Sequence, residues 1–320
     1  MKKIILAAVA AGLGLAAAGA AAQSPYPNQP IRLIVPYSAG GVTDQVGRAL
    51  AEQMGKRLGQ SVVVENKTGA NGTMGAIQML QTKPDGYTIT MVPIGIYRMP
   101  HITGAPYDPA KDFTYISQVA GYDYYLAVKA DSPWKTLADL TSYAKTHTDS
   151  ISYGTPGAYS SQHIAMVQLS DALQVQWTHI PFKGEADALA ALMGGHIQTL
   201  VGASGILPYI QNGDVRALAT LGETRSVSLP DVPTLKESGY NVVHTSAFGI
   251  AGPKGMPDAV VAKLDAAIGD ALKDTAFRDK LIQLGVSPLY LDHQAYTAAA
   301  MKSVATEKET IAKLGNITGK

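Results

Sequence analysis

Apolar residues recur with two different periods in the opening part of the chain. Residues 31–35 form a short, largely apolar run, which is typical of a buried β-strand. After a turn that contains two glycines, apolar residues recur every four positions, at Val46, Leu50, Met54 and Leu58. This spacing predicts an α-helix with one apolar face. Gly59 follows immediately and ends the predicted helix as a C-terminal cap.

The same alternation of strands and helices continues to residue 146. We expect strands at residues 61–64, 87–92, 113–119 and 124–129, and helices at residues 73–81 and 136–146. Proline, glycine and aromatic residues are frequent at 93–109, so this stretch is expected to be irregular. Because consecutive parallel strands need crossover connections, the order of elements predicts a mainly parallel sheet with helices on its faces.

A second series begins near residue 150. Its expected strands are 150–153, 176–181, 197–201 and 215–220, and its expected helices are 160–173, 185–193 and 207–212. From Pro257 onward the pattern is helical, with helices expected at 258–272, 275–284 and 294–314. These last helices have no sheet of their own, so we expect them to pack on the first series.

This order of elements predicts an α/β fold with two lobes, each with a mainly parallel sheet. We assign residues 23–123 and 245–320 to the first lobe and residues 124–244 to the second. The chain then crosses between the lobes twice, near Asp123 and near residues 244–249, and two crossings form a hinge. Ligands of such sheets gather beyond the carboxyl ends of the strands.

The N-terminus has the pattern of a secretory signal peptide. Lys2 and Lys3 precede an apolar, alanine-rich run, and Ala20, Ala21 and Ala22 provide a small-residue cleavage site. We therefore expect residues 1–22 to be removed. A membrane anchor is the alternative, but the run is rich in small residues and no second apolar span follows it.

Charge and composition narrow the classes of function. Removing the two lysines changes the formal net charge from +1 to about −1, so nothing indicates nucleic acid as a partner. The chain has no cysteine, which excludes disulfides and thiolate chemistry. The seven histidines lack the spacing of a metal motif, and no nucleophile elbow or phosphate-binding loop is present. We expect a monomer without catalytic residues, metal or cofactor.

Two glycine turns stand at equivalent places in the two lobes. The first runs from Tyr37 to Asp44, and the second runs from Gly154 to His163. Each turn follows a strand and opens a helix, where unpaired backbone N–H groups and the helix dipole favour an anion. Asp44 has the same charge sign as such a ligand, so we assign it to the dipole and not to contact. The two turns are expected to hold one anion from both sides of a cleft.

The segments around these turns resemble a known family. In the first half they are Tyr26-Pro27, Pro30-Ile31, residues 35–44, Val64-Glu65-Asn66, residues 69–75, residues 85–88, residues 107–109 and residues 111–113. In the second half they are residues 153–157, Ser161, His163, residues 181–184, residues 193–195 and residues 229–234. Over essentially the whole mature chain, this sequence is similar to the TctC or Bug family, the periplasmic substrate-binding receptors of tripartite tricarboxylate transporters.

The resemblance implies a Venus-flytrap receptor in the periplasm that closes over a small carboxylate and delivers it to integral membrane transporter subunits. It also implies that backbone and hydroxyl donors of the two turns clamp the ligand. The first turn contributes Tyr37, Ser38, Ala39, Gly40, Gly41 and Thr43. The second turn contributes Thr155, Tyr159, Ser160 and Ser161. Gly154, directly before this turn, is also expected at the site, and so is His163, which lies in the first turn of its helix, where its ring is able to donate to a carboxylate.

The chain departs from the family pattern at Phe248, where members often have tryptophan, and at residues 96–99, which are usually small and polar. Arg98 in this stretch follows a strand of the first lobe, and its guanidinium is expected to bind a second carboxylate of the ligand. Tyrosines are expected to border the cleft, at positions 37, 97, 122, 124, 153 and 159. Aromatic walls suit a flat ligand, which favours an aromatic dicarboxylate such as terephthalate.

Two alternatives remain open from the sequence. The ligand is an aliphatic dicarboxylate or tricarboxylate, or an amino acid, if the tyrosines are structural. A different class of function is an exported hydrolase that uses Ser160 or Ser161 with His163.

Overall fold

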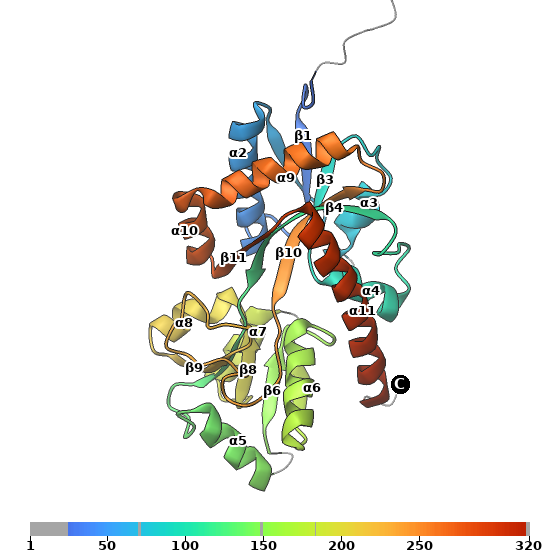
Figure 1. Cartoon of the computed structure of the whole chain (residues 1–320). Coiled ribbons are helices and arrows are strands. Elements are labelled where there is room, and N and C mark those ends of the chain that lie inside the picture. Colours follow the sequence, from blue (N-terminus) through green and yellow to red (C-terminus); the bar gives the residue numbers. More distant parts are fainter. Residues whose placement is uncertain (1–24, 70–71, 148–149, 183, 318–320) are drawn as a thin grey trace, which may run out of the picture.

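The computed structural model describes residues 25–69, 72–147, 150–182 and 184–317. Residues 1–24, which include the expected signal peptide, lie outside the described residues. The described chain forms two α/β lobes, one above the other in Figure 1. No described helix is long and apolar enough to span a membrane.

The first lobe is built on a six-stranded sheet with the order β11-β4-β10-β3-β1-β2. Its strands are β1 (Ile31–Val35), β2 (Val62–Asn66), β3 (Thr88–Val92), β4 (Phe113–Tyr122), β10 (Ser246–Pro253) and β11 (Val286–Leu291). Strand β1 pairs in parallel with β2 and β3, whereas the pairs of β10 with β3 and β4, and of β11 with β4, are antiparallel.

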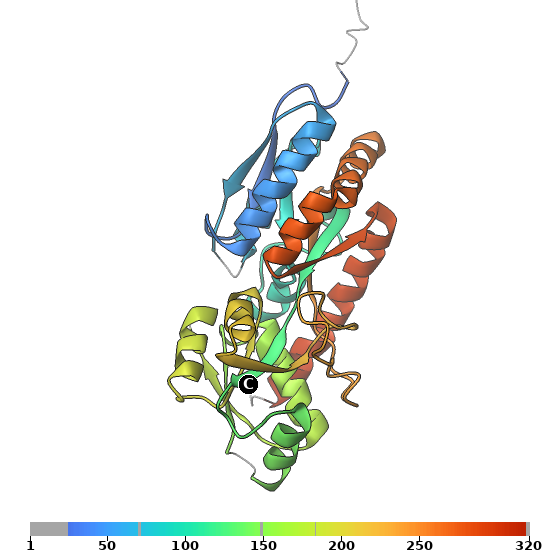
Figure 2. The same ribbon diagram turned by 90° about the vertical axis from the view of Figure 1, so that its left-hand side faces the viewer.

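Helices cover both faces of this sheet. They are α2 (Val42–Leu58), α3 (Met74–Met79), α4 (Gly95–Thr103), α9 (Asp258–Lys273), α10 (Thr275–Gln283) and α11 (His293–Ile317). Helices α2 and α9 lie side by side on one face, as Figure 2 shows. Helix α11 packs along α4 and β4 on the other face.

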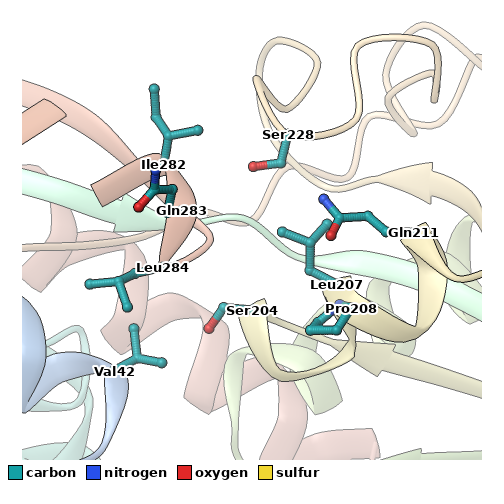
Figure 3. A pocket seen from close by; sticks show the side chains of 9 residues that line it. All are labelled: Val42, Ser204, Leu207, Pro208, Gln211, Ser228, Ile282, Gln283 and Leu284. Carbon is teal, nitrogen blue, oxygen red and sulfur yellow. The ribbon is translucent and has the colours of Figure 1, made fainter. Parts of the chain in front are cut away.

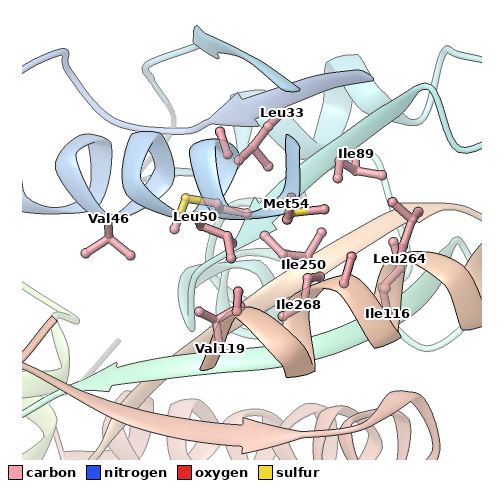
Figure 4. Packing of buried hydrophobic residues seen from close by; sticks show 14 of the residues in the cluster. Leu33, Val46, Leu50, Met54, Ile89, Ile116, Val119, Ile250, Leu264 and Ile268 are labelled. Atoms are coloured by element: carbon pink, nitrogen blue, oxygen red, sulfur yellow. The ribbon is translucent and has the colours of Figure 1, made fainter. Parts of the chain in front are cut away.

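The predicted apolar face of α2 is the centre of the first core. Val46, Leu50 and Met54 are fully buried and pack against the sheet and α9 (Figure 4). Gly59 ends the helix with a left-handed φ of 69°, and its N–H donates to the carbonyl oxygen of Gly55. The strand, turn and helix predicted from the opening pattern are therefore confirmed.

The second lobe has a five-stranded sheet with the order β7-β6-β8-β5-β9. Its strands are β5 (Tyr125–Lys129), β6 (Ser152–Thr155), β7 (Thr178–Pro181), β8 (Thr199–Gly202) and β9 (Val215–Thr220). Its helices are α5 (Leu137–Thr146), α6 (Ser161–Leu173), α7 (Glu185–Met193), the 3-10 helix η2 (Ser204–Ile206) and α8 (Leu207–Gln211). Strand β6 pairs in parallel with β7 and β8, and β5 pairs antiparallel with β8 and β9.

The two-lobed α/β architecture is confirmed, and three details are corrected. Both sheets are mixed and not mainly parallel, because each receives antiparallel strands where the chain passes between the lobes. The stretch expected to be irregular at 93–109 contains helix α4, which holds Pro100 in its interior. Strands β10 and β11 were not predicted at all.

The chain passes between the two sheets at two points. Strand β4 ends at Tyr122 and β5 begins at Tyr125, and the second passage lies between β9 and β10. Asp123, at the first passage, accepts hydrogen bonds from Ser226 at 2.6 Å and from Ser287 at 3.0 Å, residues that follow β9 and lie in β11. Its carboxylate therefore joins the two lobes at the predicted hinge.

The last helix reaches further than predicted. Helices α9 and α10 pack on the first lobe, whereas the end of α11 also touches α6 of the second lobe (Figure 1). Ile311 and Leu314 of α11 form a small apolar cluster with Ile164 of α6. Helix α11 therefore contributes a second contact between the lobes, away from the hinge.

Candidate ligand-binding site

A cavity of about 620 Å³ lies between the lobes. The first lobe lines it with Tyr37, Gly41, Val42, Thr43, Pro93, Ile94, Gly95, Arg98, Tyr122 and Ser246. The second lobe lines it with Tyr124, Pro156, Ser160, Ser161, Gln162, Glu185, Ala203, Ser204 and Gly205. Both predicted turns therefore reach the same cavity, which was the central expectation from the sequence.

The first turn is held in shape by Asp44. Its Oδ2 accepts the backbone N–H of Gly40 at 2.9 Å, which fixes the turn at the position where Gly40 has a φ of 84°. Its Oδ1 accepts from Nδ2 of Asn66 at 2.8 Å, and the same amide group donates to the carbonyl oxygen of Tyr37. The predicted role of Asp44 was to complement the helix dipole, and these bonds show that it also ties the turn to β2.

The start of α2 keeps free donors. Gly41 precedes the helix and provides no side-chain cap, and the backbone N–H groups of Val42 and Thr43 have no acceptor among the described residues. Gly41, Val42 and Thr43 all line the cavity. The positive end of the helix dipole therefore opens into the cavity with two unpaired donors, which favours an anion.

The second turn is held in shape by hydrogen bonds and close packing inside the second lobe. Thr155 is fully buried, and its hydroxyl contacts Nε2 of His179 at 2.7 Å and donates to the carbonyl oxygen of Gly157 at 3.0 Å. Gly154 packs tightly, because a Cβ at this position would lie 2.5 Å from Ile197. Gly154 and Thr155 therefore shape the turn from behind and do not line the cavity.

The start of α6 presents the second pair of donors. Ser160 caps the helix by accepting the N–H of His163 at 3.2 Å. The backbone N–H groups of Ser161 and Gln162 have no acceptor within the described chain, and both residues line the cavity. Tyr159 precedes the cap in a left-handed conformation with a φ of 61°, which few non-glycine residues adopt. The turn is thus held in an unusual shape that leaves these donors free.

His163 does not face the cavity. It is buried, and its Nδ1 accepts the N–H of Tyr159 at 3.1 Å. Its ring stacks on His179, with centroids 3.9 Å apart. Burial lowers the pKa of His163, and burial together with the neighbouring His163 lowers the pKa of His179 to about 4. Both imidazoles are therefore neutral at pH 7, and His163 supports the turn from behind.

Arg98 lines the cavity, but its charge is already paired. The side chain is 3% exposed, and its guanidinium bonds both carboxylate oxygens of Glu307 in α11, at 2.6 and 3.0 Å. It also donates to the carbonyl oxygen of Tyr159 at 2.8 Å and lies 3.5 Å from Oγ of Ser161. Arg98 therefore links α4 and α11 to the second turn. Its binding of a second ligand carboxylate stays a prediction.

Three of the six tyrosines predicted at the cleft line the cavity. They are Tyr37, Tyr122 and Tyr124. Burial raises the pKa of Tyr37 to about 12, so its hydroxyl stays protonated and remains a donor. Tyr97 is buried near Tyr296, and Tyr153 stacks on His179. The aromatic wall is therefore smaller than predicted.

The thirteen predicted site residues divide into those that line the cavity and those that do not. Six of the thirteen line the cavity: Tyr37, Gly41, Thr43, Arg98, Ser160 and Ser161. Seven do not: Ser38, Ala39, Gly40, Gly154, Thr155, Tyr159 and His163. Glu185, Ala203 and Gly205 line the cavity but were not predicted to, although Glu185 follows a glycine at the start of a predicted helix, as Val42 does.

A smaller hollow of about 440 Å³ adjoins the cavity. Figure 3 shows Val42 and the end of α10 on one side and Ser204, Leu207 and Gln211 on the other. Val42 and Ser204 line both spaces, so the two are neighbours between the lobes. No charged side chain lines the smaller hollow, whereas both predicted turns open into the larger one, which we therefore take as the site.

Two α/β lobes with helix N-termini from both sides of an interlobe cavity define a solute-binding protein of the periplasmic type. The family model of the tripartite tricarboxylate transporter family receptor, TctC, matches residues 46–316. The chain belongs to this family, and the resemblance inferred from the sequence is confirmed. It is a solute-binding receptor of the TctC and Bug type, a class that binds small carboxylates and works with membrane transporter subunits.

Relatives and solved structures agree with this assignment. A UPF0065 protein in the gbd 5′ region of Cupriavidus necator is 43% identical over 97% of this chain and 95% of its own length. A TctC solute-binding protein from Polaromonas, solved without ligand, has a TM-score of 0.80 and 32% identity, covering 90% of this chain and 99% of that one.

Two solved structures of similar proteins contain ligands. MatC from Rhodopseudomonas palustris, with bound malate, has a TM-score of 0.73 and 28% identity over 89% of this chain and all of that one. Another protein of that organism, with adipate, has a TM-score of 0.78 and 27% identity over 91% of this chain and 98% of that one.

Proposed function

We propose that this receptor captures a small carboxylate in the cavity between its lobes and delivers it to the integral membrane subunits of a tripartite tricarboxylate transporter. One observation carries the proposal. The helices α2 and α6 come from different lobes, and their N-termini open into the same cavity with unpaired N–H donors. A carboxylate between them receives hydrogen bonds and favourable dipole interactions from both sides.

Binding at such a site favours closure of the lobes. Donors from α2 and α6 meet one ligand only when the lobes are near, so the ligand stabilises the closed state by its additional contacts. The passages at Asp123 and between β9 and β10 provide the hinge. We propose that the receptor acts as an exported monomer whose signal peptide is residues 1–22, and that the membrane subunits recognise its closed surface.

The ligand proposed from the sequence is an aromatic dicarboxylate such as terephthalate. Tyr37, Tyr122 and Tyr124 support a flat ligand, because they give the cavity an aromatic wall. The two relatives with bound ligand hold malate and adipate, which are aliphatic dicarboxylates. Aliphatic acids are therefore the second candidate class for this chain.

The hydrolase alternative finds little support in the geometry. Oγ of Ser161 lies near Arg98, and Oγ of Ser160 donates to the carbonyl oxygen of Gly157. Within the described residues, neither hydroxyl has a hydrogen bond to the ring of His163. A nucleophile and a base in contact, as acyl transfer requires, are not formed by these residues.

Thermal unfolding with a panel of acids tests the proposed function. Terephthalate, benzoate, adipate, malate and citrate are compared at equal concentrations, because a ligand that binds only the folded state raises the unfolding temperature. We expect at least one dicarboxylate to stabilise the protein. Stabilisation by aliphatic acids alone would remove the aromatic proposal, and no shift with any carboxylate would overturn carboxylate binding itself.

Ser161→Ala is the matched check on the alternative function. The substitution removes a hydroxyl at the cavity and leaves the backbone donors in place. A receptor keeps measurable carboxylate binding in this variant. Turnover of ester substrates by the wild-type protein, abolished in Ser161→Ala, would instead support the hydrolase.

A further inference from the structure

A carboxylate of the protein itself lies in the cavity. Glu185 is the first residue of α7 and is partly buried, and it lines the cavity together with Ala203 and Gly205. Its Oε2 accepts the backbone N–H of Ala203 at 2.5 Å, and the N–H of Gly205 also bonds the carboxylate. The side chain is therefore held against the segment that runs from the end of β8 into η2.

Gly205 of this segment lies directly against the Glu185 carboxylate, with no space for a side chain between them. A Cβ on Gly205 would lie 2.2 Å from Oε1 of Glu185, so a larger residue would displace the carboxylate. Glu185 lines the cavity, and beyond these two backbone donors its carboxylate has no hydrogen-bond partner among the described residues, so it keeps acceptor capacity for a ligand. A fixed acceptor selects ligands more sharply than a mobile one, since little ordering is needed on binding.

The charge of Glu185 has no opposite partner among the described side chains. No ion pair of the described residues includes Glu185, and the nearest cation of the cavity wall, Arg98, is already paired with Glu307. Burial raises the pKa of Glu185, and the N–H groups of Ala203 and Gly205 counteract this effect by stabilising the carboxylate. The cavity thus has two unlike walls, with free N–H donors at α2 and α6 and a negative acceptor at α7.

We propose that Glu185 determines specificity by selecting acids that carry a hydrogen-bond donor, a hydroxyl or ammonium group, beside the carboxylate held by the two turns. The donor bonds the unused acceptor sites of the Glu185 carboxylate. A second carboxylate at the same place meets repulsion and has no cation to bind. This inference rests on the proposed function and, within its candidate ligand classes, favours acids with a donor over a donor-free dicarboxylate such as terephthalate.

Matched acids of one carbon skeleton test the selection by isothermal titration calorimetry. Succinate, malate and aspartate share one carbon skeleton and differ only in having no donor, a hydroxyl or an ammonium group. Terephthalate and 4-hydroxybenzoate form a second comparison, in which a hydroxyl replaces the second carboxylate. We expect the wild-type protein to bind the donor-bearing member of at least one series roughly tenfold more tightly, as hydrogen bonds to charged groups allow.

Glu185→Gln removes the charge and nearly keeps the shape. It is expected to lower that preference roughly tenfold and to strengthen binding of the donor-free dicarboxylate. Glu223→Gln is the matched control, because it removes the same charge from an exposed side chain of the same lobe, paired with Lys236 outside the cavity. The control is expected to keep the wild-type preference. Thermal unfolding without ligand checks that both variants are folded.

Different results would overturn the role of Glu185 and the proposed receptor function. If acids bind but the donor preference is absent, or is the same in Glu185→Gln as in the wild-type protein, the role of Glu185 is overturned while the receptor function stands. If no acid binds the wild-type protein, the proposed function is overturned and the role of Glu185 falls with it.

Discussion

Asp44 and Glu185 are two carboxylates at the starts of two helices, one in each lobe, and their pKa values are shifted in opposite directions. Both lie in the first turn of their helix and accept a backbone N–H from a neighbouring loop. Asp44 also accepts hydrogen bonds from Nε of Arg48 at 2.9 Å and from Nδ2 of Asn66 at 2.8 Å. Glu185 accepts hydrogen bonds only from backbone N–H groups, those of Ala203 and Gly205.

The pKa values follow the partners and not the position in the helix. Burial raises the pKa of Asp44, but hydrogen bonds from Arg48, Gly40 and Asn66 outweigh burial and lower it to about 2. For Glu185 burial is the larger effect, so its pKa is raised. A satisfied carboxylate supports the fold, whereas one that keeps unused acceptor capacity in a cavity is available for a ligand.

Glu307 extends the comparison and gives the largest expected effect. It is a buried carboxylate with a full bidentate partner, Arg98, and its side chain is 9% exposed. Glu307→Ala leaves the guanidinium buried and unpaired, so we expect a loss of about 3 to 5 kcal/mol in the free energy of unfolding. Urea denaturation of the variant and the wild-type protein measures it.

Glu309→Ala is the control for Glu307→Ala. Residue 309 lies on the same helix, is exposed and forms no ion pair among the described residues. We expect its substitution to change stability by less than about 0.5 kcal/mol. Equal effects of the two substitutions would show that the Arg98 pair does not stabilise the fold.

Asp44→Asn is expected to cost about 2 kcal/mol of stability at pH 7, because the native carboxylate has a pKa of about 2 against an ordinary value of 3.8. A lowered native pKa gives stability that is present above pH 3.8 and lost as the pH falls toward 2. The difference between wild type and variant therefore shrinks over that window. Denaturation series at pH 7, 4 and 3 measure this difference.

Asp187→Asn provides the comparison for Asp44→Asn. Asp187 is also in the first turn of a helix, α7, but it is exposed. If the helix dipole alone stabilised Asp44, the two substitutions would have similar effects. We expect the change at Asp187 to stay within about 0.5 kcal/mol.

Local patterns predicted the first turn and helix well. The strand 31–35, the turn and the apolar spacing of α2 are set by residues close in sequence, and the same holds for the turn before α6. The missed strands lack such patterns. Strand β10 is rich in small residues and glycine, and β11 is only partly buried and contains Pro288, so both are defined by their pairing with β4.

The roles of single site residues were harder to predict, because they depend on partners distant in sequence. Arg98 was expected to be free for a ligand, but its partner, Glu307, is 209 residues away. Glu185 was seen only as the first residue of a helix, and its partner Ala203 comes from the loop after a different strand. Periodicity and turn residues indicate which elements form, but not which side chains they bring together.

The smallest expected effect is the one that separates Glu185 from Asp44. Glu185→Gln removes a carboxylate whose native pKa is raised, and such a group is less favourable to the fold when it is ionised. We therefore expect the variant without ligand to be as stable as the wild-type protein at pH 7, or more stable by up to about 1 kcal/mol.

As the pH falls toward the ordinary value of 4.5, the wild-type carboxylate takes up a proton more readily in the folded state, and this advantage of the variant disappears. The pH trend is thus opposite in sign to that of Asp44→Asn. A loss of stability at pH 7 comparable to that of Asp44→Asn would mean that Glu185 is a structural carboxylate of the same kind.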